Sequence, residues 1–114
     1  MKSKVTLSPL ATYHLSKIAE HFKIDTQTLF KNISNCSGNS FALKNHGLKS
    51  IVQDYFPNLA FSVKYAQKDL SYALDMADQM GLSTPGSTTI NNLFTKAIDA
   101  GYGDLYFPVI KKIL

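Results

Sequence analysis

The sequence predicts an all-α protein of about six helices in one compact domain spanning residues 1–114. Two observations carry this prediction. Apolar residues recur at intervals of three and four along most of the chain, whereas the alternation typical of strands is scarce. Short stretches rich in Ser, Gly, Asn and Pro separate these segments, as expected at helix ends. With 114 residues, of which 45% are hydrophobic, the chain can build one core but not two.

The first two helices follow from their capping residues. Ser8-Pro9 combines a preferred N-cap residue with a proline at the first helical position, and this helix should end near Lys23. Asp25 can cap a second helix over residues 26–36, which the segment SGNS at 37–40 ends. The side chains expected to face the core are Leu10, Tyr13, Leu15, Ile18, Ala19, Phe22, Leu29, Phe30 and Ile33.

The next two helices are predicted from similar signals. The third should cover residues 41–56, between the capping Ser40 and the terminating Pro57. The fourth should cover residues 61–80, with Gly81 as its left-handed C-terminal cap. On this fourth helix, the row expected to face the core consists of Ala66, Leu70, Ala73, Leu74 and Ala77.

Two helices are expected in the last third of the chain. The fifth should run over residues 85–100, with a proline at its start, and close at Gly101. Asp104 is expected to cap a short last helix. The apolar residues of that helix are Val109, Ile110, Ile113 and Leu114.

The charged residues indicate which partners are expected. All twelve basic residues are lysines, and the net charge at pH 7 is +4. Arginine is the preferred side chain for bidentate contacts to phosphates and to guanine, so its absence counts against a nucleic-acid-binding domain, the weakest of the functions considered. We interpret the charge as favouring solubility, with at most one anion site, and expect no nucleic-acid partner.

Composition also bears on compartment and on metal binding. Cys36 is the only cysteine, so no internal disulfide can form and a cytoplasmic location is predicted. No segment approaches the roughly 20 apolar residues of a membrane span, and the first residues lack the apolar stretch of a signal peptide, so no membrane association is expected. His14, His21 and His46 do not have the spacing of metal ligands, and no metal is expected.

The segment KYAQKDLSYALDMADQMGLSTPGS, residues 64–87, holds the candidate site. Lys68 and Asp69 are adjacent, and neighbouring residues on a helix point about 100° apart, so the two cannot pair across one face. Asp69 shares its helical row with apolar residues, and Lys68 shares a row with two tyrosines. These neighbours are Ala73, Met76 and Met80 beside Asp69, and Tyr65 and Tyr72 beside Lys68.

Four stretches of the chain, in order, resemble the C-terminal all-helical domain of the β-hydroxyacid dehydrogenases, which include 3-hydroxyisobutyrate dehydrogenase. The strongest is FSVKYAQKDLSYALDMADQMGLSTPGS, which is similar to the family's Lys-Asp-Leu helix with its downstream Gly and Pro. The others are LSKIAEHFKIDTQTL, NCSGNSFAL and AIDAGYGDLYFPVIKKIL. The resemblance covers nearly the whole chain and implies a fold like the C-terminal domain of the 6-phosphogluconate and 3-hydroxyisobutyrate dehydrogenases.

The resemblance implies roles for the two adjacent charged residues. In the family, the lysine of the Lys-Asp-Leu segment reaches across the interdomain cleft to the bound dinucleotide, NAD or NADP, and Lys68 stands at that position. Asp69 is expected to lie at the substrate cleft or to have a structural role. Its place on an apolar row suggests a buried carboxylate, which must be hydrogen-bonded or paired.

Two parts that the family's enzymes need are missing from the sequence. It has no Gly-x-Gly-x-x-Gly turn, the mark of a Rossmann dinucleotide-binding domain. The family's catalytic lysine would fall just before Met1, and Lys2 and Lys4 lack its surroundings, so no catalytic residue is assigned. The chain alone is therefore expected to bind no cofactor. Single positions also depart from the family's pattern: its glycine is Lys23, its glutamate His14 and its aspartate Tyr106.

These features leave two main functional hypotheses. The first is the C-terminal domain, as a fragment or split product, of an NAD(P)-dependent 3-hydroxyisobutyrate dehydrogenase-like oxidoreductase. It would contribute the cleft wall and the subunit interface and would be inactive alone, unless another chain supplied the dinucleotide-binding domain. The alternative is a helical protein-interaction module that keeps the fold without catalysis.

A homodimer is predicted under either hypothesis. Apolar side chains of the fourth and fifth helices that would meet a longer first helix should lie bare, and a twofold contact between two chains can cover them. The first helix could also be exchanged between the two chains. The candidates for the bare patch are Met76, Met80, Ile90 and Phe94.

Overall fold

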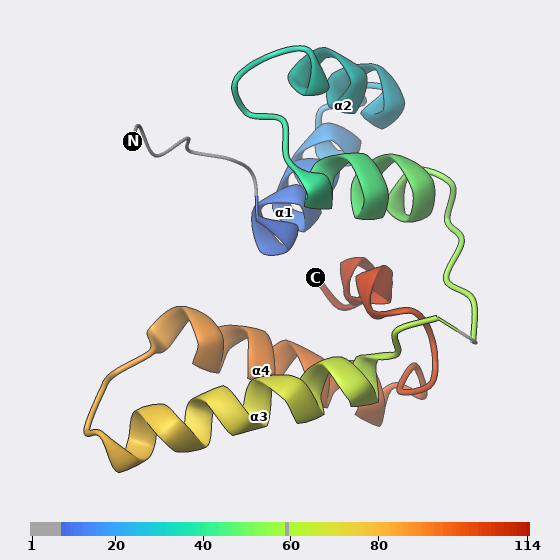
Figure 1. The fold of residues 1–114 in the computed structure, drawn as a ribbon. Helices are drawn as coiled ribbons and strands as arrows, with labels where there is room; N and C mark the ends of the chain where they lie inside the picture. The colour runs from blue at the N-terminus through green and yellow to red at the C-terminus, as the bar shows by residue number, and fades with distance from the viewer. Residues whose placement is uncertain (1–7, 59) are drawn as a thin grey trace. The chain divides into compact units, whose positions relative to one another are not determined.

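A computed structural model describes residues 8–58 and 60–114 and confirms the all-α prediction (Figure 1). Lys2 and Lys4 lie outside the described residues. Within them, the only extended pairing is an isolated antiparallel bridge between Ser62 and Tyr106. The helices are α1 (Pro9–His21), α2 (Thr26–Ser34), η1 (Ala42–Ile51), α3 (Val63–Gln79), α4 (Pro85–Asp99) and η2 (Phe107–Ile113).

The first two helices begin where their capping residues predict. The Ser8 hydroxyl oxygen accepts a hydrogen bond from the Ala11 N–H at 3.2 Å, and proline occupies the first position of α1. Asp25 accepts from both the N–H and the hydroxyl of Thr28, at 3.1 and 2.6 Å. These two bonds favour the carboxylate and lower the pKa of Asp25.

Three helices end in the same hydrogen-bonded turn, with Lys23, Gly81 and Gly101 in the left-handed conformation at φ 56°, 68° and 90°. In each, the left-handed residue donates its N–H to a carbonyl three residues back, and the next residue donates to one five residues back. This is the Schellman arrangement. Gly81 and Gly101 confirm the prediction. At the first of these turns a lysine takes the conformation that favours glycine.

The third helix is shorter than predicted: η1 ends at Ile51 and does not continue to residue 56. Its backbone has wider, π-type turns, such as the 2.9 Å bond from the Val52 N–H to the Gly47 carbonyl. Asp54 then turns left-handed at φ 51°, and the Tyr55 N–H bonds to the Ser50 carbonyl. This turn stops the helix before the proline restriction that the prediction relied on applies.

The first unit of the fold contains α1, α2 and η1 and extends to Tyr55. Gly47 sits where η1 crosses the other two helices: a Cβ there would lie 3.0 Å from the Phe30 ring and 3.2 Å from a Thr12 methyl carbon. Phe30 and Thr12 are fully buried. The core is smaller than predicted on α1, since Ile18 and Phe22 are exposed.

The second unit, Phe56–Ile113, is built on α3 and α4, which run side by side in opposite directions (Figure 1). The Gln67 side-chain amide of α3 donates to the Asn91 side chain at 3.2 Å and to the Thr95 hydroxyl at 2.9 Å, both on α4. The buried apolar residues of these two helices include Ala66, Ala77, Phe94 and Ala97.

The tail of the chain caps the start of α3. The N–H groups of Val63 and Lys64 donate to the carbonyls of Leu105 and Gly103, both at 3.0 Å, and the Tyr65 N–H donates to the Ser62 hydroxyl at 3.2 Å. The first three N–H groups of a helix have no partner within it, so these bonds satisfy groups that would otherwise need water.

The predicted role of Asp104 as a helix cap is wrong. The residues around it form a turn that is hydrogen-bonded to the start of α3, and the last helix begins only at Phe107. Asp104 instead pairs with the Lys64 ammonium, Nζ to Oδ1, at 3.1 Å. Both side chains are largely exposed, so this pair contributes little to stability.

The left-handed Lys23 yields a stability prediction. Lys23→Gly should raise the free energy of unfolding by about 0.5–1 kcal/mol, because glycine adopts this conformation without the steric cost borne by a side chain. The matched control is Gly81→Ala at the equivalent turn of α3, which should lower it by about 1 kcal/mol. Urea denaturation measures both, and a loss of stability in the Lys23 variant would contradict the assignment.

The close contact at Gly47 yields a second stability prediction. Gly47→Ala should lower the free energy of unfolding by about 1–2 kcal/mol, because overpacking against the buried Phe30 and Thr12 outweighs the better helix propensity of alanine. Gly86→Ala on α4, where a Cβ meets nothing within 4 Å, is the control and should be neutral or stabilising. Thermal and urea melts should separate the two, and similar effects would refute the packing argument.

Candidate functional site: the outward face of α3

Helix α3 has one buried side and one outward side. Val63, Ala66 and Ala77 are buried, and Leu70 and Leu74 are half-buried between them. Helical spacing places Lys68 and Tyr72 opposite this row, and both are exposed. The predicted core row is therefore correct except at Ala73, which is exposed.

Lys68 lies on this outward face, and its ammonium is exposed to solvent. Among the described residues its ammonium has no hydrogen bond and no ion pair, and only its backbone carbonyl is engaged, by the Ser71 hydroxyl at 2.6 Å. Lys64, one turn earlier, is by contrast held to Asp104. Of these two lysines, Lys68 is the one available to an anionic ligand.

Asp69 is exposed, so the expectation that its carboxylate is buried is wrong. Within the part of the chain that the structure describes, it makes no side-chain hydrogen bond or ion pair. The row on which it lies is apolar but also exposed, at Ala73, Met76 and Met80. Helical spacing identified the row correctly but could not tell which side of the helix is covered.

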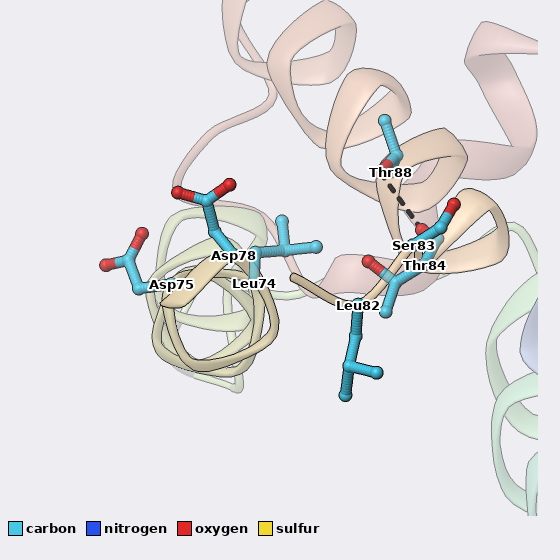
Figure 2. A pocket seen from close by; sticks show the side chains of 7 residues that line it. All are labelled: Leu74, Asp75, Asp78, Leu82, Ser83, Thr84 and Thr88. Carbon is cyan, nitrogen blue, oxygen red and sulfur yellow. Dashed lines mark hydrogen bonds between the residues drawn. The ribbon is translucent and has the colours of Figure 1, made fainter. Parts of the chain in front are cut away.

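One hollow among the described residues lies at the C-terminal end of α3 (Figure 2). It has a volume of about 420 Å³ and opens between the end of α3 and the start of α4. Figure 2 shows Leu74 pointing toward the connecting loop, while Asp75 points away from it. The Thr88 hydroxyl donates to the Thr84 carbonyl at 3.0 Å. The lining residues are Leu74, Asp75, Asp78, Leu82, Ser83, Thr84 and Thr88.

This hollow does not suit a phosphate. Asp75 and Asp78 supply negative charge and no lysine lines it, so an anion would be repelled. Neither Lys68 nor Asp69 contributes to it. No histidine or cysteine lines the hollow. Among the described residues, no cluster of three His, Cys, Asp or Glu side chains is placed to hold a metal ion.

The histidines and the cysteine all belong to the first unit of the fold. His14, His21 and Cys36 are exposed in the first unit. His46 is half-buried beside the Phe41 ring, and burial lowers its pKa below the ordinary value of 6.5, so the neutral imidazole is favoured. At Tyr106, burial raises the pKa of the phenol.

None of the helices described is long and apolar enough to cross a bilayer.

The chain belongs to the family described as the NAD-binding region of NADP-dependent 3-hydroxyisobutyrate dehydrogenase, whose model matches residues 6–111. L-threonate dehydrogenase of Escherichia coli K12 is 29% identical over 106 residues, which cover 88% of this chain and 34% of the relative. Glyoxylate/succinic semialdehyde reductase 1 of Arabidopsis thaliana is 39% identical over 51 residues, 45% of this chain and 18% of the relative.

Two solved structures share the fold. The 3-hydroxyisobutyrate dehydrogenase of Salmonella typhimurium superposes with a TM-score of 0.82 at 26% identity, over 93% of this chain and 36% of that one. The enzyme of the same name from Mycobacterium tuberculosis gives 0.77 at 23% identity, over 92% and 38%. The chain thus spans about a third of the length of the curated relatives that match it over most of its own length.

The orientation of α3 yields a third prediction. Lys68→Ala and Asp69→Ala should each change the free energy of unfolding by less than about 0.5 kcal/mol, because both side chains are exposed and unpaired. Leu70→Ala should cost about 1–3 kcal/mol, since its side chain is half-buried on the core row of α3. Urea melts of the three variants test this. Equal losses at all three positions would mean that the helix face is assigned wrongly.

Proposed function

We propose that this chain is the helical C-terminal part of an NAD(P)-dependent 3-hydroxyacid dehydrogenase, and that the outward face of α3 forms one wall of its cofactor cleft. Membership in the family supports this proposal, because the matching model is named for NAD binding. The single observation that carries the assignment to α3 is the exposed ammonium of Lys68, which has no partner among the described residues.

The residues present fit one contact to the cofactor and no more. A compact ammonium on a helix suits a phosphate or ribose oxygen, since it can bind a single oxygen and does not need the bidentate geometry of an arginine. The sequence contains no glycine-rich phosphate loop, so the pyrophosphate would be held elsewhere, by a dinucleotide-binding domain in the same longer protein or in another chain. The bound nicotinamide would supply hydride transfer to or from a small 3-hydroxy acid or its semialdehyde.

Asp69 is proposed to line the substrate side of the same cleft. It lies one residue from Lys68, about 100° around the helix, so a ligand that spans both rows could meet the ammonium and the carboxylate together. We also propose a cytoplasmic location, because Cys36 is an exposed free thiol, a state that a reducing compartment maintains.

The fourth prediction concerns the chain by itself. It should show no dehydrogenase activity and no measurable affinity for NAD or NADP, because one cationic contact cannot offset the translational and rotational entropy that a dinucleotide loses on binding. Isothermal titration calorimetry with both cofactors is the measurement. Micromolar binding would contradict the proposal that most contacts to the cofactor come from a separate dinucleotide-binding domain.

A chimera tests the proposed function directly. Residues 6–111 would replace the matching third of the E. coli L-threonate dehydrogenase, and cofactor reduction would be followed with L-threonate. Lys68→Ala in the chimera should raise the KM for the dinucleotide by about tenfold, the loss expected for one charged hydrogen bond. Lys96→Ala on α4 is the control and should leave this KM unchanged. If both variants behave alike in an active chimera, Lys68 does not contact the cofactor.

A further inference from the structure

The Gln67 side chain, next to Lys68 on α3, forms a polar link to α4. Its amide nitrogen donates to the Asn91 side-chain oxygen at 3.2 Å and to the Thr95 hydroxyl oxygen at 2.9 Å, and it lies 3.4 Å from the Asn91 carbonyl oxygen. One amide therefore contacts two residues that stand a single turn apart on the neighbouring helix. Gln67 and Asn91 are both half-buried.

The Thr95 hydroxyl is oriented to accept this bond. It donates its own proton to the Asn91 carbonyl at 3.2 Å, a bond back to the preceding turn of α4. The lone pairs of the hydroxyl oxygen are then left for the Gln67 amide. The three side chains form one directional network, and such a network favours a single arrangement of the helices that it joins.

The packing around this network constrains the helix pair less sharply. The buried residues of the two helices are Val63, Ala66 and Ala77 on α3 and Phe94 and Ala97 on α4. Phe94, expected from the sequence to lie bare, is thus among them, and Ile90 is half-buried. Ridges of side chains set how packed helices cross, and alanine, which supplies three of these five residues, adds only a low ridge.

The network is also the one side-chain hydrogen-bonded link between α3 and α4 within the part of the chain that the structure describes. The other side-chain bonds of these helices stay within one helix, as from the Ser71 hydroxyl to the Lys68 carbonyl, or cap the start of α3. The cap and the Gln67 network therefore hold α3 at two points one turn apart, and Lys68 follows the second point directly.

We propose that Gln67 is a positioning residue for Lys68. By joining α3 to Asn91 and Thr95, it fixes the rotation of α3 about its own axis and thereby the place at which the Lys68 ammonium meets the cofactor. This inference rests on the proposed function, because it takes the contact between Lys68 and the cofactor as given. Gln67 acts through Lys68 and not by touching the cofactor, since its amide is engaged with α4.

A small rotation of α3 is enough to matter. An α-helix with its side chains has a radius of about 5–6 Å, so a rotation of about 20° would move an ammonium at its surface by about 2 Å. A charged hydrogen bond spans about 2.7–2.9 Å and would be broken by this displacement. Because a lysine side chain is flexible, it can recover part of the contact. Loss of the network should therefore cost less than loss of Lys68 itself.

Residual dipolar couplings of the backbone N–H groups, measured on the whole chain, test the network. Gln67→Met keeps the length and helix propensity of the side chain but removes the amide, and Thr95→Val removes the hydroxyl at similar shape. Each should change the orientation of α3 relative to α4. Thr95→Ser keeps the hydroxyl and should match the wild type, as should Gln79→Met at an exposed glutamine of the same helix. An unchanged orientation in Gln67→Met would overturn the proposal.

A double-mutant cycle in the active chimera tests whether Gln67 acts through Lys68. Gln67→Met should raise the KM for the dinucleotide about threefold and leave kcat unchanged, as for a lost contact that is equal in the ground and transition states. In a chimera that already carries Lys68→Ala, it should add nothing, because the ammonium that it positions is gone. Gln79→Met should have no effect in either background.

The outcomes separate this inference from the proposed function. If Lys68→Ala raises the KM but Gln67→Met does not, or if Gln67→Met raises it equally in the Lys68→Ala background, the positioning role alone is overturned. If Lys68→Ala leaves the KM unchanged, the proposed function fails and the positioning role fails with it.

Discussion

The cap on the first turn of α3 is the interaction on which the rest of the second unit depends. Carbonyls of Gly103 and Leu105 and the Ser62 hydroxyl accept the first three N–H groups of the helix. They fix where α3 begins and hold the segment around Asp104 against its first turn. On the helix that follows, Leu70 is half-buried on the same side as the buried Ala66, whereas Lys68 is exposed on the outward side.

Local signals allowed much of the fold to be predicted from the sequence. Ser8, Asp25 and Gly81 act through bonds to residues three to five positions away, and each has the expected role. The errors arose where a distant segment decided the outcome. Asp104 resembles a cap for the helix that follows it, but the tail is held along the start of α3, more than 35 positions earlier in the chain.

The candidate site was predictable in part for the same reason. Helical spacing placed Lys68 and Asp69 on adjacent rows, and family resemblance singled out the lysine. Neither could reveal that both rows form one exposed face, because burial depends on what packs against a helix. This also explains why Tyr65 and Tyr72 were recognised as neighbours of Lys68 but not as parts of a surface. The same exposed face supports the proposed function, since the ammonium of Lys68 is exposed and has no partner among the described residues.

Chemical footprinting tests the central claim, that the outward face of α3 meets the cofactor, most directly. An active chimera containing residues 6–111 would be treated with a limiting amine-acetylating reagent, with and without saturating NADP or NAD, and the modification of each lysine measured by mass spectrometry. The account predicts that the cofactor slows acetylation of Lys68 several-fold and leaves Lys96 on α4 unchanged. Equal rates at Lys68 with and without cofactor would contradict it.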